Sequence, residues 1–241
     1  MSAEDANQKL GGLILTSEND SIDDAHVTIP GEFSAGNGGA ASVQVGGLIH
    51  SATNGSISNS SVTFQNSPAV NFSGEGGALG GFIHTLDGTT ITNSKVVGTI
   101  QNNNDDQADS IYAGFVLAMN SGSISNSYSR LNMTVEANLV VPLQRVGGFV
   151  YELAGGTIDR AYYAGSITTT GAAVESFDFI AISSGSGIIT NSFYDSTIGP
   201  DTETVAVGKT TADMQSAVPY ANWFTSNWVF TSGQYPKLIW E

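Results

Sequence analysis

GSISNS occupies residues 55–60, and the same six letters return at residues 122–127. Two close copies, TTITNS and GIITNS, occupy residues 89–94 and 187–192. The isoleucine of each phrase belongs to a longer series with successive spacings of 35, 34, 33, 34 and 31 residues: Ile22, Ile57, Ile91, Ile124, Ile158 and Ile189. A nearly constant period of this length indicates one supersecondary unit that is stacked on copies of itself.

A glycine-rich motif keeps the same period. It reads LGGLIL, VGGLIH, LGGFIH, YAGFVL and VGGFVY, and its first small residues are spaced by 35, 34, 33 and 34: Gly11, Gly46, Gly80, Ala113 and Gly147. The stretch FDFIAI at residues 177–182 looks like a sixth copy from which the glycines are lost. Because two separate motifs stay in phase, the chain is predicted to contain six repeats.

The composition of the repeats favours strands over helices. Helical repeats of similar length need Ala, Leu, Glu and Lys with helical periodicity. Here the repeats are short alternating runs of Gly, Ser, Thr, Asn, Val and Ile, which are typical of strands and turns. Two or three short strands per repeat predict an all-β fold, a parallel β-solenoid of about six coils with a period near 34 residues. With coils about 4.8 Å apart, the rod would be on the order of 30 Å long.

Stacking in register places equivalent residues of successive coils directly above one another. We therefore expect an apolar ladder inside the solenoid, made by Ile57, Ile91, Ile124 and Ile189. We also expect an amide ladder at a turn, in which each side chain hydrogen-bonds to the next: Asn59, Asn93, Asn126 and Asn191. Asp24 and Arg160 interrupt this series. The glycine doublets suit tight corners or close backbone approach.

The repeat resembles the GLUG motif, which is named for its Gly-Leu-x-Gly core and occurs in tandem in large bacterial surface proteins. Such proteins include haemagglutinin-like adhesins and the non-catalytic part of some IgA-cleaving metallopeptidases. The resemblance covers roughly residues 10–200, where the core reads GGLI, GGLI, GGFI, AGFV and GGFV, and Asn-Ser follows in four of six repeats. It implies a shared scaffold and not a particular activity.

The repeats stop near Val205, which divides the chain into residues 1–9, 10–204 and 205–241. The last segment holds all three tryptophans, Trp223, Trp228 and Trp240. Because a solenoid exposes apolar side chains and strand edges at its ends, we expect this segment to be a C-terminal cap, with a short helix over residues 212–218 capped by Thr211. The alternative is an aromatic platform that binds sugars. Residues 1–9 are expected to cap the other end, with a short helix over residues 2–9.

The charge and composition exclude several kinds of partner. The chain has 22 acidic and 7 basic residues, a formal net charge of −15, which disfavours nucleic acids and anionic membrane surfaces. It has no cysteine, so it forms neither disulfides nor thiolate metal sites. No run of 18 apolar residues is present, and we expect no membrane insertion. The first ten residues lack the pattern of a signal peptide, so an exported chain would be mature or an excised fragment.

Two groups of residues are candidate metal ligands. Asp105, Asp106 and Asp109 lie in NNNDDQAD, a stretch rich in the oxygen ligands that calcium prefers, although no known calcium-loop motif is present. His50 and His84 occupy the same place in consecutive coils and should stack about 5 Å apart. They either share a metal ion or form a half-buried ladder, and we expect the ladder. A second acidic group, Glu18, Asp20, Asp23 and Asp24, has no calcium-loop spacing.

The sequence favours a protein without enzymatic activity. It has no HExxH, no Gly-x-Ser-x-Gly and no phosphate loop. Acidic residues stand at Asp23 and Asp159, but coils one and five lie about 19 Å apart, too far to share a glycosidase site. An ice-binding surface would need threonines in aligned columns, and the threonines do not align with the period.

These observations predict a non-enzymatic module of a larger extracellular or cell-surface protein of bacterial origin, which acts as a rigid binding or spacer rod. We expect its partner to be a host or bacterial surface protein or a glycan, and we expect no cofactor other than calcium at residues 105–109. The alternative is a glycan-binding or glycan-active domain on the same fold. A lateral groove lined by aromatic and charged side chains would favour the alternative, and plain Ser, Thr and Asn faces would favour the rod.

Overall fold

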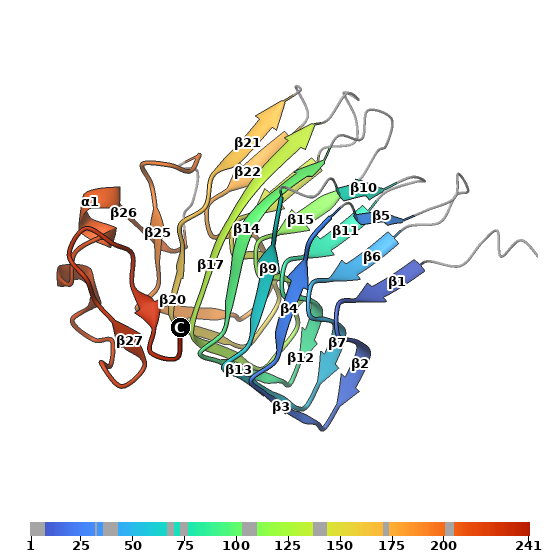
Figure 1. The fold of residues 1–241 in the computed structure, drawn as a ribbon, viewed down its shortest axis with the longest axis horizontal. Coiled ribbons are helices and arrows are strands. Elements are labelled where there is room, and N and C mark those ends of the chain that lie inside the picture. Colours follow the sequence, from blue (N-terminus) through green and yellow to red (C-terminus); the bar gives the residue numbers. More distant parts are fainter. Residues whose placement is uncertain are drawn as a thin grey trace, which may run out of the picture.

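The computed structural model describes residues 8–31, 33–35, 43–66, 70–72, 77–102, 110–136, 144–170, 174–200 and 205–241. Almost all regular structure in these ranges is β-strand, and the strands of successive repeats lie side by side (Figure 1). The prediction of an all-β parallel solenoid with a period near 34 residues is confirmed.

One repeat supplies four short strands that run around one coil. In the second coil they are β6 (Val43–Gly46), β7 (Ile49–Thr53), β8 (Ser56–Ser58) and β9 (Ser61–Phe64). Each strand pairs in parallel with the equivalent strand of the neighbouring coils. Because parallel strands cannot be joined by a tight hairpin, the chain closes each coil before it starts the next.

Two lateral sheets contain six strands, one from each repeat. The first consists of β1 (Gln8–Gly11), β6, β11 (Gly77–Gly80), β15 (Ile111–Ala113), β18 (Gln144–Gly147) and β22 (Val174–Phe177). The second consists of β2 (Ile14–Glu18), β7, β12 (Ile83–Asp87), β16 (Val116–Met119), β19 (Val150–Leu153) and β23 (Ile180–Ser183).

Most of the remaining parallel strands form one larger sheet. Its first column is β3 (Ser21–Asp23), β8, β13 (Thr90–Thr92), β17 (Ser123–Glu136), β20 (Thr157–Tyr163) and β24 (Ile188–Thr190). Beyond a turn it continues with β4 (His26–Ile29), β9, β14 (Lys95–Asn102), β21 (Ile167–Thr170), β25 (Phe193–Asp195) and β26 (Val207–Lys209). Two small pairs complete the described strands: β5 (Phe33–Ala35) with β10 (Val70–Phe72), and β27 (Trp228–Val229) with β28 (Lys237–Leu238).

The number of coils differs slightly from the predicted six. All six repeats contribute strands and give their numbers to coils one to six, but only about four of these are full turns. The end repeats are less completely buried, as Leu13, Leu15 and Ile188 show with 50%, 47% and 56% exposure. The reason is that an end coil has a neighbour on one side only. The predicted N-terminal helix also differs, because Gln8 and Lys9 already belong to β1; residues 1–7 lie outside the described ranges.

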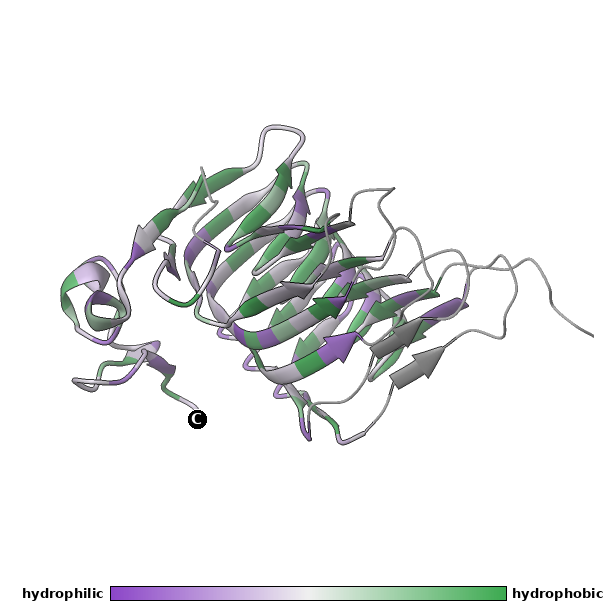
Figure 2. Cartoon of the chain, turned by 90° about the horizontal axis from the view of Figure 1, so that it is seen from above, coloured by the Kyte–Doolittle hydropathy of each residue, from purple (hydrophilic) through white to green (hydrophobic). Residues whose placement is uncertain are grey.

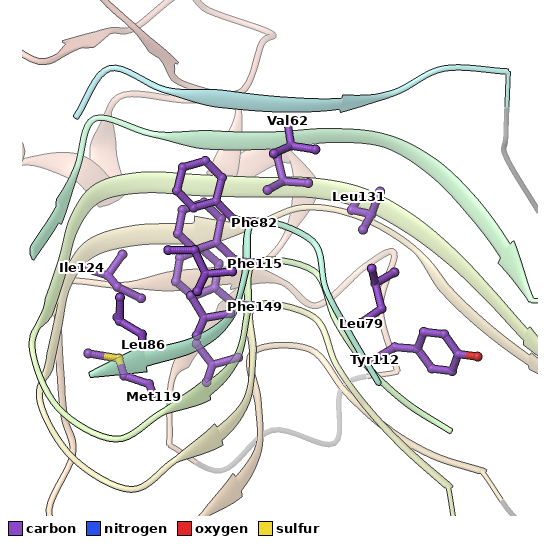
Figure 3. Close-up of a cluster of buried hydrophobic side chains, with 14 of the residues drawn as sticks. Val62, Leu79, Phe82, Leu86, Tyr112, Phe115, Met119, Ile124, Leu131 and Phe149 are labelled. Atoms are coloured by element: carbon purple, nitrogen blue, oxygen red, sulfur yellow. The ribbon is translucent and has the colours of Figure 1, made fainter. Parts of the chain in front are cut away.

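Equivalent core side chains form continuous ladders. Phe82, Phe115, Phe149 and Phe179 are fully buried, and their successive ring centroids are each 4.8 Å apart. Figure 3 shows three of these rings above one another. The predicted isoleucine ladder pairs in register through Ile57, Ile91, Ile124, Ile158 and Ile189, of which the first four are buried and the last packs against the core. The ring spacing equals the spacing of hydrogen-bonded strands, so each coil repeats the same packing.

The glycine doublets allow two coils to approach at a corner. A Cβ atom on Gly46 would lie 1.8 Å from the carbonyl oxygen of Ile49 in the same coil. A Cβ atom on Gly47 would lie 2.0 Å from the carbonyl oxygen of Gly81 in the next coil. In this coil a larger residue at either place would clash with backbone unless the corner shifts, which favours glycine there. Ala113 holds the first position in coil four, and coil six lacks both glycines.

The asparagines of the repeated phrase share one backbone conformation. Asn59, Asn93, Asn126 and Asn191 have φ between 46° and 50°, and the residues that replace asparagine in coils one and five, Asp24 and Arg160, have φ of 58° and 52°. Asparagine tolerates this left-handed turn better than most residues. The turn itself, rather than pairing between amides, is therefore what the repeated asparagine supplies.

The predicted amide ladder was wrong in its hydrogen bonding. In the described part of the chain these amides do not bond to one another along the stack. The Nδ2 atoms of Asn59 and Asn191 donate to the carboxylates of Asp23 and Asp159, each at 2.8 Å. The left-handed turn directs the asparagine side chains outward, where other polar groups reach them first.

The serine that follows each asparagine forms the polar ladder instead. Ser60, Ser94, Ser127 and Ser192 are at most 3% exposed. The Ser94 hydroxyl donates to the carbonyl of Thr92 at 2.9 Å and accepts from the backbone amide of Ser60 at 3.3 Å. The same pair of bonds recurs at Ser60 and Ser192. One buried hydroxyl thus links each of these coils to the preceding one.

Candidate functional site

Most of the C-terminal segment lies beside the stack and not over its end. It leaves the last coil after β26 and runs along the side of the solenoid, back towards the first coil (Figure 2). Trp240 makes ring contact with His26 of coil one, at a centroid distance of 5.2 Å. The expectation of an end cap is therefore corrected for residues 210–241, which are called the strap below, whereas β26 extends the last coil by pairing with β25.

Three tryptophans, which the sequence predicts to lie in a cap, attach the strap to the solenoid. The indole nitrogens donate to three of the asparagine turns: Trp223 to the carbonyl of Asn191 at 2.9 Å, Trp228 to the side chain of Asn126 at 3.2 Å and Trp240 to the carbonyl of Asn93 at 2.8 Å. These turns belong to coils six, four and three. The outward asparagine column is thus the docking line of the strap.

An aromatic cluster lies between the strap and the solenoid. Tyr128 and Tyr162 stack with a centroid distance of 4.8 Å on the outer face of the coils. Trp223 and Trp228 pack over Tyr162, and Met214 and Tyr220 fill the same cluster. Its largest members are at most 5% exposed. Burial is also the main cause that raises the pKa of both stacked tyrosines, so they remain neutral. These aromatics serve packing rather than an exposed sugar platform.

The short helix of the strap begins one residue before the predicted position. Helix α1 spans Thr211–Met214, and its N-cap is Thr210, whose hydroxyl accepts from the backbone amide of Asp213 at 3.2 Å. A 3-10 turn follows at Val218–Tyr220. The helix ends early because Met214 and Tyr220 turn inward to the aromatic cluster.

The last residue of the chain is fixed against the solenoid. Lys95 Nζ lies 2.8 Å from Glu241 Oε2, and both side chains are about one-seventh exposed, at 16% and 14%. The Tyr128 hydroxyl donates to the same carboxylate at 3.0 Å, and so does the backbone amide of Leu238 at 2.8 Å. Three donors, from Lys95, Tyr128 and Leu238, thus hold this carboxylate against the solenoid.

A groove opens where the strap meets β14 and β17. It has a volume of about 430 Å³ and is lined by Lys95, Val97, Gly98, Thr99, Tyr128, Arg130, Asn132 and Glu241. A second groove of about 250 Å³ is lined by Arg130, Gln215, Gly233, Gln234, Tyr235 and Lys237. Arg130 lines both. Three of the seven basic residues of the chain thus gather at one place on an otherwise acidic protein.

Sequence reasoning missed this groove and the residues that line it. Lys95 and Arg130 stand after the repeated phrase, at positions that carried no motif of their own. One signal was present: Tyr128, Tyr162 and Phe193 follow the phrase at one register position, which indicates an aromatic column on the outer face. What covers that column depends on the path of the strap, and no periodicity describes it.

The predicted histidine ladder is present. His50 and His84 stack with a centroid distance of 4.7 Å and are 4% and 8% exposed. His50 Nε2 contacts Gln44 Oε1 at 3.2 Å, and His84 Nδ1 contacts the Thr85 hydroxyl at 2.9 Å. Burial, with the neighbouring His50 and Lys9 charges, lowers the pKa of His84 to about 3. Among the described residues no group of three His, Asp or Glu side chains is placed to hold a metal ion.

The acidic residues that the sequence suggested as metal ligands differ in where they lie and what they bond to. Asp105, Asp106 and Asp109 lie outside the described residues, so calcium there stays a prediction. Asp20 accepts from the hydroxyl of Ser17 at 3.0 Å, and Asp23 accepts from the hydroxyl of Ser58 at 2.7 Å. Hydrogen bonds from Ser58 and Asn59 lower the pKa of Asp23. The Asp23 carboxylate thus joins coil one to coil two, whereas the Asp20 carboxylate bonds within coil one.

No family model, no curated protein and no solved structure matches this chain. The resemblance to GLUG repeats therefore rests on the motifs alone. None of the helices in the described ranges has the length and apolar character that crossing a bilayer requires.

Proposed function

We propose that the chain is a non-enzymatic module of a larger extracellular or cell-surface protein and acts as a rigid rod that presents a binding face. The observation that supports this most is the strap. A single segment contacts coils one, three, four, five and six along one side of the stack. Such a segment opposes bending and separation of the coils.

The surface location, the bacterial origin and the adhesin role are proposed from the resemblance to GLUG repeats. A larger parent chain belongs to the same proposal. The partner is a host or bacterial surface protein or a glycan, because the net charge of −15 disfavours nucleic acid and anionic membranes.

Single-molecule force spectroscopy tests whether the chain is mechanically rigid. The chain is placed between two marker domains and pulled from its termini, with the Phe115→Ala variant as a comparison. We expect abrupt unfolding in one or a few large steps, and a lower force for the variant because its core ladder holds a cavity. Gradual extension at low force, without a step, would contradict a rigid rod.

A polysaccharide assay tests the absence of catalysis. The chain is incubated with polygalacturonate and with neutral plant and bacterial polysaccharides, and new reducing ends are measured over hours. We expect no increase above a heat-denatured control. A time-dependent increase that scales with protein concentration would assign the chain to the glycan-active alternative.

Glycan binding without cleavage is the second candidate. The groove at Arg130 favours it, because that groove is concave, partly charged and lined by hydroxyl and amide groups. A rod that also binds glycans is compatible with the first proposal, since the groove lies on the side of the stack.

A further inference from the structure

We propose that the groove at Arg130 binds a sugar residue that carries a carboxylate, such as a uronic or sialic acid within a glycan. This inference rests on the second candidate, glycan binding, and not on the rigidity of the rod. It specifies the place, the charged contact and the class of ligand.

The groove has a suitable size and lining. Its volume of about 430 Å³ is within the roughly 300–1,000 Å³ of small-molecule sites. Val97 supplies apolar surface for the carbon–hydrogen face of a sugar ring, and Thr99 and Asn132 supply groups that bond to hydroxyls. No side chain stands at Gly98, where a Cβ would lie 2.1 Å from the carbonyl oxygen of Phe64.

The two cations of this groove differ in what holds them. Lys95 is paired with Glu241, as described above, so its charge is already balanced. The described residues give the Arg130 guanidinium no hydrogen bond and no ion pair; its contact is with the ring of Tyr235, 5.0 Å from the centroid. Its Nε atom is buried and unpartnered. A partly buried guanidinium with unused donors is set up to receive an anion.

The shape of the guanidinium favours a carboxylate. Arginine presents parallel N–H groups that match the two oxygens of a carboxylate, and the Arg130 guanidinium lies over the ring of Tyr235, 5.0 Å from its centroid. A single unpaired guanidinium in this groove, on a protein of net charge −15, suits a ligand with isolated single charges. A densely charged polyanion would be repelled by the rest of the surface.

The adjoining groove allows the glycan to continue. It shares Arg130 with the first groove, and its walls are the polar residues Gln215, Gln234 and Lys237. The acidic residue of the glycan therefore binds at the junction, and neighbouring sugars extend along the edge of the strap.

Calorimetry and spectroscopy on the full chain test this inference. The probes are 3′-sialyllactose and tri-galacturonate, compared with neutral lactose and with lactose 3′-sulfate. The variants are Arg130→Gln and, as a matched control, Arg145→Gln, which removes an exposed arginine that is paired with Glu175 at 2.9 Å on another face. Thermal melting shows whether each variant is folded. If Arg130→Gln does not fold, Thr99→Val replaces it.

We expect at least one carboxylated probe to bind roughly tenfold or more tightly than lactose, and Arg130→Gln to weaken that binding by roughly 10- to 100-fold, as loss of a charge-assisted pair implies. Arg145→Gln should stay within about twofold of the parent chain. Equal binding by Arg130→Gln, equal binding of lactose, or binding of the sulfate alone would overturn the proposal. If no probe binds while the pulling experiment shows abrupt unfolding, the glycan inference fails and the rod stands.

Discussion

At the residue scale, three side chains of the repeated phrase have different structural roles. Isoleucine enters the core, asparagine makes the left-handed turn, and serine bonds two coils together. The asparagine amides were predicted to form the ladder because stacked amides are known to pair. The structure assigns that role to the buried serines, since their hydroxyls lie on the inner side of the turn.

Replacing one ladder serine tests this division. Ser94→Ala leaves the backbone amide of Ser60 without its buried acceptor, and we expect unfolding free energy to fall by about 1–3 kcal/mol. Denaturant titration measures the change. The control is Ser56→Ala, an exposed residue, for which we expect a change within about 0.5 kcal/mol. Equal effects of the two substitutions would show that the buried hydroxyls are not the ladder.

The buried histidines predict a dependence of stability on pH. Because the pKa of His84 is lowered to about 3 in the folded state, protonation at lower pH favours the unfolded chain. Its contribution is complete above the unfolded value near 6.5 and is lost as the pH falls towards 3. Between pH 7 and pH 5 we expect a loss of about 2 kcal/mol.

His84→Leu removes the side chain that causes this pH dependence. Leucine should fit at this position, because Leu117 occupies the equivalent place in the next coil. The variant should lose less stability than the parent chain between pH 7 and pH 5, as measured by denaturant titration at both values. The carboxylates and His50 are present in both proteins, so the difference between their losses of stability is due to His84. If the two proteins lose stability equally, His84 is not protonated in this range upon unfolding.

At the scale of elements, the strap and the coils form two packed units. The coils share the main core, whereas Trp223, Trp228 and Tyr220 belong to a separate cluster that Tyr128 and Tyr162 join from the outer face. The strap has little regular structure of its own in the described ranges, so its order depends on docking to the asparagine turns and on the Glu241 carboxylate.

Trp228→Ala tests whether the strap detaches on its own. Removal of this indole leaves a cavity and an unpaired Asn126 side chain, and a buried tryptophan is typically worth about 3–5 kcal/mol. In hydrogen exchange we expect the amides of residues 211–241 to lose protection, while the strands at Ile83–Asp87 and Val116–Met119 keep theirs. Equal loss in the strap and in these strands would mean that the two units unfold together.

The solenoid could be predicted from the sequence, and the strap could not. In-register stacking requires the same kind of residue at equivalent positions of successive coils. The period, the isoleucine ladder and the histidine pair can therefore be predicted from the sequence. The strap follows no period: its place depends on outward groups such as Tyr128, Asn126 and Lys95 from different coils. The Arg130 groove exists because the strap lies beside that arginine, so it was hidden for the same reason.

At the scale of the whole molecule, each repeat forms one coil that is stacked in register on its neighbours. Ser56 and Thr90 are exposed and directly opposed on β8 and β13, while Thr92 lies two residues further along the same strand. Opposed residues of neighbouring strands are about 4.8 Å apart, within the range that a disulfide bridges, and the diagonal pair is beyond it. The chain has no cysteine of its own, so introduced pairs are unambiguous.

The measurement is therefore disulfide formation under mild oxidation, read by mass spectrometry, in Ser56→Cys/Thr90→Cys and in Ser56→Cys/Thr92→Cys. In-register stacking predicts a rapid intramolecular disulfide in the first variant and little or none in the second. If the second variant forms the disulfide as readily, or the first forms none while folded, the coils are not stacked in the register described.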